Sequence, residues 1–298
     1  MEFRQLRYFL AVAEHLHFTE AAFHLGIAQP PLSQQILKLE REIGTALFIR
    51  HARRVELTEA GHLFRERARK IVSDAEQALA DAQNAGRGHM GRLSLGFAGS
   101  TVFHPAMALT MQQFRRAYPR VTINCEESNS IALLDKVALG QLDAALVRLP
   151  LHCGELIVEP LVKEEMLAVL PSEHPKGQRK QIKLADLAYD MFVLFPRSIG
   201  PNLYDSILGA CQTAGFAPSI RMESPQISSA ANLVSAGFGV ALVPSSMRQV
   251  QVAGVSYHEL RGKPLSTAIA LIYRPDETAP AVLNFARIVH EYHTSYRH

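Results

Sequence analysis

Residues 18–43 have the sequence FTEAAFHLGIAQPPLSQQILKLEREI, in which two helical patterns are separated by a glycine. Thr19 is suited to cap the first, short helix, and Gly26 then allows the chain to turn with a positive φ. The second helix begins near Gln29, because the prolines that follow are tolerated in a first turn. Its apolar residues form one buried stripe at helical spacing, consisting of Leu32, Ile36, Leu39 and Ile43.

The other face of the second helix is polar and contains Gln29, Ser33, Gln34 and Lys38. An apolar repeat over residues 6–16 predicts a further helix before it. In a helix-turn-helix, one side of the second helix packs on its neighbours and the other lies in the major groove, where Gln and Ser hydrogen-bond to base edges and phosphates. The alternative is a generic three-helix bundle with a solvated polar face, and spacing alone leaves both interpretations open.

Residues 47–57, LFIRHARRVEL, predict two short strands around a basic tip, which would form a wing beside the second helix. Three arginines lie here with no acid between them. A solvated surface would explain one or two, but three beside a helix-turn-helix favour contacts with phosphates or the minor groove. We therefore expect double-stranded DNA to be bound by Thr19, Gln29, Pro30, Pro31, Ser33, Gln34, Lys38, Arg50, Arg53 and Arg54.

Residues 58–85 predict a long connecting helix, with Thr58 as its cap and Glu59 in its first turn. At 1.5 Å per residue this helix would be roughly 40 Å long. Such length favours pairing with a second chain over packing on the chain's own C-terminal domain. The apolar residues follow a heptad seam, consisting of Phe64, Ala68, Ile71, Ala75, Ala78 and Ala82. Three glycines then end the helix and mark a hinge, namely Gly86, Gly88 and Gly91.

From Arg92 onward, strand and helix patterns alternate, which predicts an α/β domain with a parallel sheet and helices on both faces. One set of strands covers 93–97, 121–126 and 142–147, with helices at 106–118 and 131–139, and a second set covers 166–170, 191–195, 219–222 and 240–243. The last strand, 267–273, and the helix from Ala279 are expected to return to the first set. We therefore expect two lobes with a cleft between them.

Polar residues stand where strands of the first lobe end and helices begin. Ser100 and Thr101 follow one strand, Ser130 follows the next, and Arg148 ends the third. Open parallel sheets bind ligands at this edge, and hydroxyls, free amides and a cation there suit an anion. The alternative is that the hydroxyl residues only cap helices and that Arg148 pairs with a nearby acid.

Several motifs keep the order and spacing of one family, namely 18–22 (FTEAA), 25–33 (LGIAQPPLS), 39–44 (LEREIG), 47–48 (LF) and 57–61 (LTEAG). Through them, about the first 60 residues resemble the LysR-type transcriptional regulators. The resemblance implies a winged helix-turn-helix, a dimerisation helix and a sensor like the periplasmic binding proteins. It also implies dimers that assemble into tetramers, a small inducer and RNA polymerase as a partner. Ala28 stands where many members carry a capping Ser, and Gln34 where many carry Arg.

Within this family the chain most resembles the regulators of benzoate and catechol degradation, through its Gln-Pro-Pro-Leu-Ser and Pro-Asn elements. This implies that Pro201 and Asn202, together with Ser100 and Ser130, contact an aromatic or dicarboxylic acid. Leu203 stands where such relatives carry an aromatic residue. We expect a transcriptional regulator that is switched by a small carboxylate or aromatic acid, and the sequence leaves activation or repression open.

The remaining composition excludes several other classes. The 298 residues carry a net charge of +3, which permits a polyanion partner without requiring one. No secretory signal, membrane span, enzyme motif, cofactor motif or metal-ligand spacing occurs, so we expect a cytoplasmic protein that is not an enzyme. A redox role for Cys211 competes with an ordinary buried thiol. A solute receptor is the strongest rival, since the last two thirds alone would suit one.

These patterns divide the chain into three expected parts. Residues 1–58 form the winged helix-turn-helix and residues 59–89 the linker helix. Residues 90–298 form the effector-binding domain, with lobe I at about 90–161 and 267–298 and lobe II at about 162–266.

Overall fold

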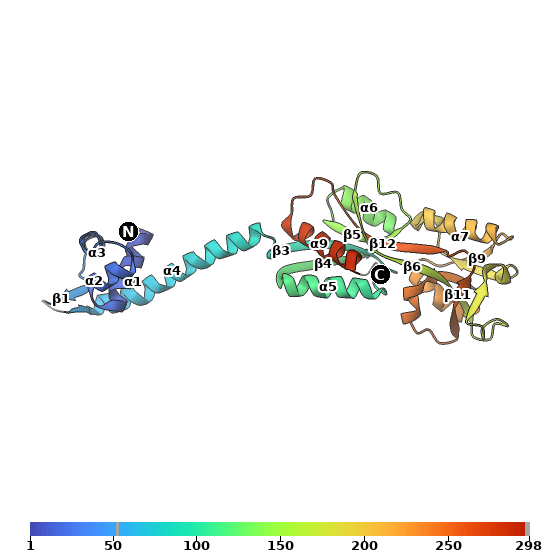
Figure 1. Cartoon of the computed structure of the whole chain (residues 1–298), viewed down its shortest axis with the longest axis horizontal. Coiled ribbons are helices and arrows are strands. Elements are labelled where there is room, and N and C mark those ends of the chain that lie inside the picture. Colours follow the sequence, from blue (N-terminus) through green and yellow to red (C-terminus); the bar gives the residue numbers. More distant parts are fainter. Residues whose placement is uncertain (52–53, 296–298) are drawn as a thin grey trace. The chain divides into compact units, whose positions relative to one another are not determined.

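The structure is a computed structural model that describes residues 1–51 and 54–295. The chain forms two compact units, Met1–Asn84 and Ala85–His298 (Figure 1). None of the helices in the described ranges combines the length and hydrophobicity that a membrane span requires.

Three helices form the first unit's core, α1 (Phe3–His15), α2 (Phe18–His24) and α3 (Gln29–Ile43). The predicted stripe of α3 faces inward, because Leu32, Ile36 and Leu39 are fully buried. Gly26, at the end of α2, has a φ of 68°, a conformation in which most side chains would be strained. The predicted helix-turn-helix is confirmed.

The cap of α2 differs from the prediction. His17 is the N-cap, since its Nδ1 accepts a hydrogen bond from the Glu20 amide at 3.3 Å. Thr19 lies inside the first turn and is exposed. The assignment of Thr19 as the cap was wrong because an imidazole nitrogen can also satisfy a first-turn amide, and it does so two residues earlier.

The wing consists of β1 (Phe48–Arg50) and β2 (Val55–Leu57), which pair antiparallel. Glu40 of α3 holds β1 in place, because its carboxylate accepts hydrogen bonds from the amides of Leu47 and Phe48 at 2.8 and 3.0 Å. The wing is therefore anchored to the second helix of the helix-turn-helix.

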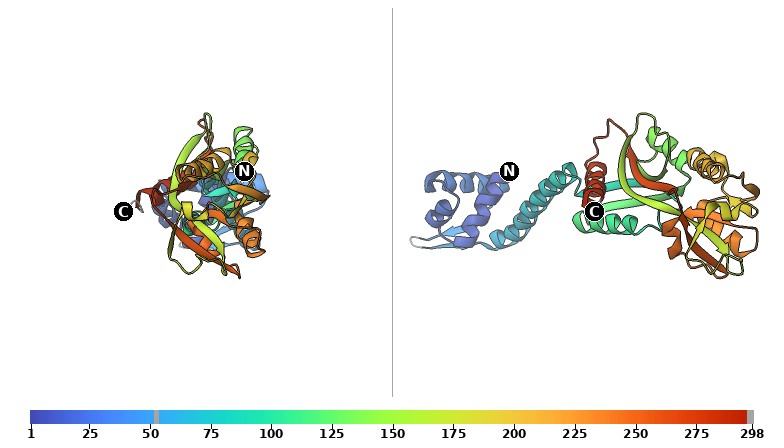
Figure 2. Two further views of the ribbon diagram at one scale, coloured as in Figure 1. Left: turned by 90° about the vertical axis from the view of Figure 1, so that its right-hand side faces the viewer. Right: turned by 45° about the vertical axis from the view of Figure 1, so that its right-hand side comes forward.

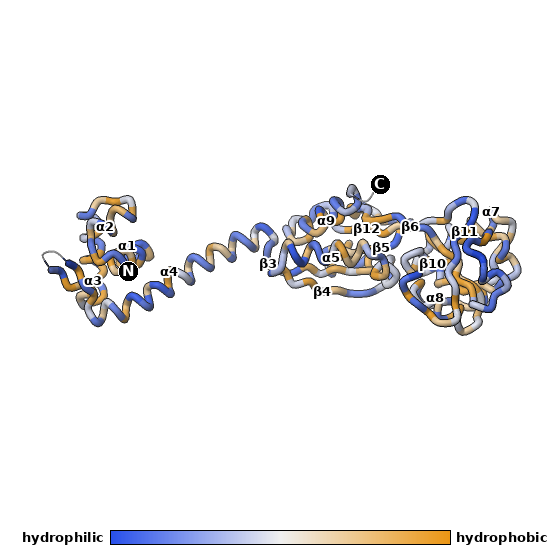
Figure 3. Tube along the Cα trace, turned by 60° about the horizontal axis from the view of Figure 1, so that its bottom comes forward, coloured by the Kyte–Doolittle hydropathy of each residue, from blue (hydrophilic) through white to orange (hydrophobic). Residues whose placement is uncertain are grey.

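Helix α4 (Glu59–Gly86) begins after Thr58, whose side chain accepts a hydrogen bond from the Gly61 amide at 2.9 Å. This confirms Thr58 as the cap. Hydrophobic residues recur along the helix (Figure 3), but they do not all form one free seam. Phe64 and Ala68 pack into the first unit's own core, so the prediction was wrong for this part of the seam.

The remaining seam residues of α4 are exposed. A row of exposed apolar side chains, which no element of residues 1–51 and 54–295 covers, runs along the helix and consists of Ile71, Ala75, Ala78, Leu79 and Ala82. Leu79 is 62% exposed. An isolated helix gains nothing by presenting such a row to water.

The second unit contains an eight-stranded sheet in the order β4-β3-β5-β12-β6-β11-β7, with β10 also paired to β6. Its strands are β3 (Met90–Ala98), β4 (Arg120–Ser128), β5 (Ala144–Leu149), β6 (Ile157–Pro171), β7 (Gln181–Lys183), β10 (Ala241–Pro244), β11 (Val255–Arg261) and β12 (Ser266–Tyr273). A separate parallel pair is formed by β8 (Met191–Leu194) and β9 (Ser219–Glu223).

Strand β6 runs through two lobes of this unit. Its first part pairs with β12, and its last part pairs with β10 and β11. We use lobe I for β3–β5, β12 and the first part of β6, with α5 (Pro105–Ala117), α6 (Ser130–Ala138) and α9 (Pro280–Ser295). Helices α5 and α9 lie side by side, and the ring centroids of Phe114 and Phe285 are 5.3 Å apart (Figures 1 and 2).

Lobe II contains the rest of the sheet, the β8–β9 pair and its own hydrophobic cores. Its helices are α7 (Pro201–Thr213) and α8 (Ala230–Ser235), with 3₁₀ turns η1 (Leu184–Leu187), η2 (Arg197–Ile199), η3 (Ile227–Ser229) and η4 (Ser245–Gln249). Burial of β10 is complete, whereas β11 is half-exposed and polar.

The α/β class is confirmed, but the sheet is mixed rather than parallel. β3 pairs parallel with β4 and β5, whereas β12 runs antiparallel to both β5 and β6. The prediction also lacked β7 and β11. The sequence VSYHELR of β11 has few apolar residues, because the strand lies near the sheet's edge, so its period-two signal was too weak to detect.

Candidate DNA-binding face and effector pocket

The start of α3 carries most of the residues that we expected to bind DNA. Pro30, Pro31, Gln34 and Lys38 are exposed. Gln29 and Ser33 are half-buried. Pro30, Pro31, Gln34 and Lys38 lie on the side of α3 away from the buried stripe, whereas Gln29 and Ser33 lie at its edge. Thr19 is exposed in the first turn of α2.

Arg50 at the end of β1 contacts both helices of the helix-turn-helix. Its guanidinium donates hydrogen bonds to Ser33 Oγ at 3.3 Å and Glu40 Oε2 at 3.2 Å. It also lies over the ring of Phe18, 4.8 Å from the centroid. This placement lets Arg50 position the wing against α3, in addition to any contact with phosphate.

The other predicted cations are more open. Arg54 is 69% exposed and pairs with Glu56 at 2.9 Å, and Lys38 pairs with Glu2 at 3.3 Å. Exposed pairs of this kind contribute little to stability, so a phosphate could replace the carboxylate at small cost. Arg53 lies outside the described residues.

A small pocket, about 30 Å³ in volume, lies between the two lobes. Lobe I contributes the ends of β3 and β5 and the start of α6, including Ser100, Ser130 and Arg148. Lobe II contributes mainly apolar side chains, namely Phe195, Ile199, Leu203 and Ile227, together with Gln226. The polar groups thus lie mainly on one side and the carbon wall on the other.

The start of α6 contributes hydrogen-bonding groups to the lobe I side of the pocket. Asn129 is the N-cap and accepts a hydrogen bond from the Ala132 amide at 2.9 Å, while other first-turn amides have no partner within the helix. Ser130 Oγ and Ser100 Oγ each accept a hydrogen bond from Arg148, at 3.1 and 2.8 Å. Each hydroxyl also carries a hydrogen that it can donate to a ligand.

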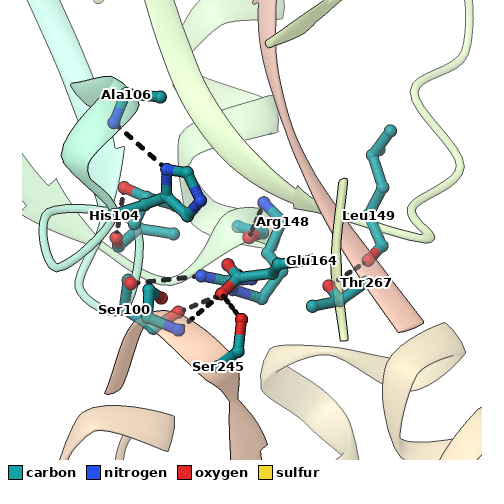
Figure 4. Close-up of polar contacts among 12 residues, drawn as sticks. Ser100, His104, Ala106, Arg148, Leu149, Glu164, Ser245 and Thr267 are labelled. Atoms are coloured by element: carbon teal, nitrogen blue, oxygen red, sulfur yellow. Dashed lines mark hydrogen bonds and ion pairs between the residues drawn. The ribbon is translucent and has the colours of Figure 1, made fainter. Parts of the chain in front are cut away.

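Arg148 is held in a buried ion pair with Glu164 of β6, at 2.8 Å between Nη1 and Oε1 (Figure 4). Its Nη2 also donates to the Ser100 carbonyl at 3.1 Å. The other carboxylate oxygen accepts from the Ser246 amide of η4 at 2.8 Å and from Ser245 Oγ at 3.2 Å. This network therefore joins β5, the shared strand β6 and the first turn of η4.

Charge and burial act in opposite directions on this network. Burial by itself would raise the pKa of Glu164, but the charge of Arg148 and the hydrogen bonds from Ser246 and Arg148 lower it below its usual value. Nearby, burial lowers the pKa of His104, which caps α5, although the charge of Glu164 partly opposes that shift. Glu164 is thus held ionised opposite Arg148.

Three of the six predicted effector residues do not line this pocket. Thr101 is fully buried, and its hydroxyl donates to the Ala98 carbonyl at 2.7 Å. Pro201 is the first residue of α7. Asn202 lines a separate opening beside Lys163.

The sequence reasoning missed most of the lobe II wall. Gln226 and Ile227 follow β9, just as Ser100 and Ser130 follow β3 and β4. Ligands of open α/β sheets bind at the carboxyl ends of strands, and in lobe II this principle indicates Gln226 and Ile227.

Cys211 is fully buried on α7, and burial raises the pKa of its thiol to about 11. A protonated, inaccessible thiol is a poor nucleophile, so the ordinary buried thiol is the better interpretation. Within residues 1–51 and 54–295, no three side chains form a group that could hold a metal ion.

A winged helix-turn-helix followed by a two-lobed ligand-binding domain defines a DNA-binding regulator that responds to a small molecule. Residues 3–62 match the model "Bacterial regulatory helix-turn-helix protein, lysR family", and residues 86–294 match "LysR substrate binding domain". The chain belongs to the LysR family of transcriptional regulators, which confirms the resemblance and excludes the solute receptor.

Curated relatives and solved structures agree with this assignment. The HTH-type transcriptional regulator BudR of Raoultella terrigena is 41% identical over 96% of this chain and 99% of its own. AlsR of Bacillus subtilis is 34% identical over 97% of this chain and 95% of its own. The crystal structure of CbnR, a LysR family transcriptional regulator, matches 97% of this chain and 100% of its own with 28% identity and a TM-score of 0.88. These relatives are regulators rather than enzymes.

Proposed function

We propose that this regulator reads its operator through the exposed face of α3, with the wing contacting the adjacent backbone. The observation that carries this proposal is the separation of α3 into a fully buried apolar stripe and a polar side next to the anchored wing. A CbnR structure bound to its target DNA, 27% identical with a TM-score of 0.82, supports the same use of the fold. The functional parts are residues 1–58, 59–89 and 90–298.

Replacing Gln29 by Ala is expected to weaken binding to the DNA upstream of the gene by about 10- to 100-fold, because a base contact carries about 1–3 kcal/mol of discrimination. Binding to a random duplex should change little. Fluorescence anisotropy with both duplexes at several salt concentrations measures this.

Arg54→Ala is the matched comparison. This variant should bind both duplexes more weakly, and to the same extent. The slope of log affinity against log salt concentration should fall by about one, as expected for a lost phosphate contact. If Gln29→Ala lost the same affinity for both duplexes, Gln29 would not contribute to sequence-specific recognition.

We also propose that a small carboxylate, aromatic or aliphatic, binds in the pocket between the lobes. The first turn of α6 and the hydroxyls of Ser100 and Ser130 would hold the carboxylate, while Leu203 and Ile227 cover the carbon part. Arg148 contributes mainly by orienting the two hydroxyls, because its guanidinium is already paired with Glu164. A dicarboxylate would need its second charge to lie against a mostly carbon wall.

Ser130→Ala is expected to weaken effector binding about 10- to 100-fold, since a hydrogen bond to a charged group contributes about 1.5–3 kcal/mol. The wild-type protein is titrated with benzoate, muconate and short aliphatic acids in a thermal-shift assay to find the effector. Isothermal titration calorimetry then compares the variant with wild type and with Thr101→Ser, whose residue does not line the pocket. Absence of any response to all these acids would overturn the carboxylate proposal.

The exposed row on α4 supports a dimer formed through this helix, with dimers assembling into tetramers on DNA. A dimer that binds two DNA half-sites at once has a much higher affinity than one DNA-binding domain has for one half-site. Effector binding would change the relative populations of lobe arrangements and thereby alter how RNA polymerase is recruited.

A further inference from the structure

A groove of about 820 Å³ lies in lobe II, between α7 and the turn that joins β11 to β12. Its volume falls in the upper part of the roughly 300–1000 Å³ of most small-molecule pockets, so the groove is large enough for a medium-sized ligand. It is distinct from the pocket between the lobes, because the two share no lining residue.

The groove has a basic side. Lys183, Arg261 and Lys263 line it, and no Asp or Glu appears among the described residues that do so. Arg261 and Lys183 lie directly opposite each other on the neighbouring strands β11 and β7. Like charges in opposed positions repel, and within the described part of the chain none of these three cations forms an ion pair.

The floor of the groove is apolar. Leu184, Leu260 and Leu265 are partly buried there and pack against the hydrophobic core of lobe II. Further apolar surface for an occupant comes from Ala210 of α7 and from Ala214, which caps the end of that helix.

Gly209 leaves open space in the wall formed by α7. It lies inside this helix, where glycine is unfavourable, and an added Cβ would meet nothing within 4 Å. Packing within the chain therefore does not require glycine at this position, and the space that it leaves opens onto the groove.

We propose that this groove binds an elongated amphipathic anion, such as a medium-chain carboxylate, with its charged end at Lys183, Arg261 and Lys263. The unpaired cations provide the charge complementarity, and the leucine floor accommodates the hydrocarbon part. This second ligand site does not depend on what binds between the lobes.

Decanoate is the probe, titrated calorimetrically into the full-length protein below its micelle-forming concentration. One saturable site per chain is expected in this groove. Gly209→Leu should weaken decanoate binding at least tenfold, because its Cβ has room and its side chain extends into the groove. Arg261→Gln combined with Lys263→Gln should weaken it to a similar extent, whereas uncharged decanol should bind weakly to wild type.

Control variants test whether decanoate binds in this groove and not elsewhere on the protein. Gln212→Leu adds a leucine to an exposed part of α7 outside the groove, and Lys180→Gln removes a cation outside it; both should bind decanoate as wild type does. Ser130→Ala should also leave decanoate binding unchanged, whatever its effect on the other pocket. Unchanged binding in Gly209→Leu, loss in Ser130→Ala, or binding of an acidic peptide in place of decanoate would each overturn the proposal.

Discussion

Glu164→Gln is expected to destabilise the effector-binding domain by about 3–5 kcal/mol, because it leaves the charge of Arg148 buried without its partner. Both side chains of this pair are almost fully buried, with exposures of 3% for Arg148 and 2% for Glu164. Glutamine preserves the shape and can still accept a hydrogen bond, so the loss reports on charge. Urea unfolding followed by circular dichroism measures it.

The double variant Arg148→Met with Glu164→Leu is the informative control. Replacing both charges by apolar groups removes the desolvation cost as well as the attraction, and should recover much of the lost stability. If the double variant were as unstable as Glu164→Gln, loss of packing rather than an unpaired charge would be responsible.

The stabilisation by the Arg148–Glu164 pair should depend on pH. The pKa of Glu164 is lowered in the folded protein, so its stabilisation is fully present above the unfolded value of about 4.3. That stabilisation is lost as the pH falls through the lower, folded pKa. The difference in stability between wild type and Glu164→Gln should therefore be constant near neutral pH and shrink in acid.

Introducing glutamates into the exposed row of α4 should have the largest effect on DNA binding. Ile71→Glu combined with Leu79→Glu places like charges where two helices would meet, and should produce monomers. Operator affinity should fall at least about 100-fold, because simultaneous binding of two half-sites is lost. Analytical ultracentrifugation and anisotropy with operator DNA measure the two effects.

Ser73→Glu combined with Ala80→Glu adds the same charge to the opposite side of α4. This control should remain dimeric and bind operator DNA normally. Dimers that persist in the Ile71 and Leu79 variant would show that another surface holds the chains together.

The local sequence by itself determined the helix-turn-helix. The stripe from Leu32 to Leu39, the turn at Gly26 and the Thr58 cap are short-range patterns, and each acts within a few residues. The motifs around them were specific enough to indicate the family. Strands that are buried on both faces, such as β10, were also predicted because their apolar runs are continuous.

Only the tertiary structure decided which residues share a site. Phe64 and Ala68 fit the same heptad pattern as Ile71, but they pack into the hydrophobic core of the first unit. Thr101 and Ser100 are neighbours in sequence, yet one hydroxyl turns to the Ala98 carbonyl and the other meets Arg148. Arg148 of β5 can pair with Glu164 of β6 because β12 lies between these two strands and pairs with both. Such contacts depend on how distant segments come together, and local periodicity carries no information about that.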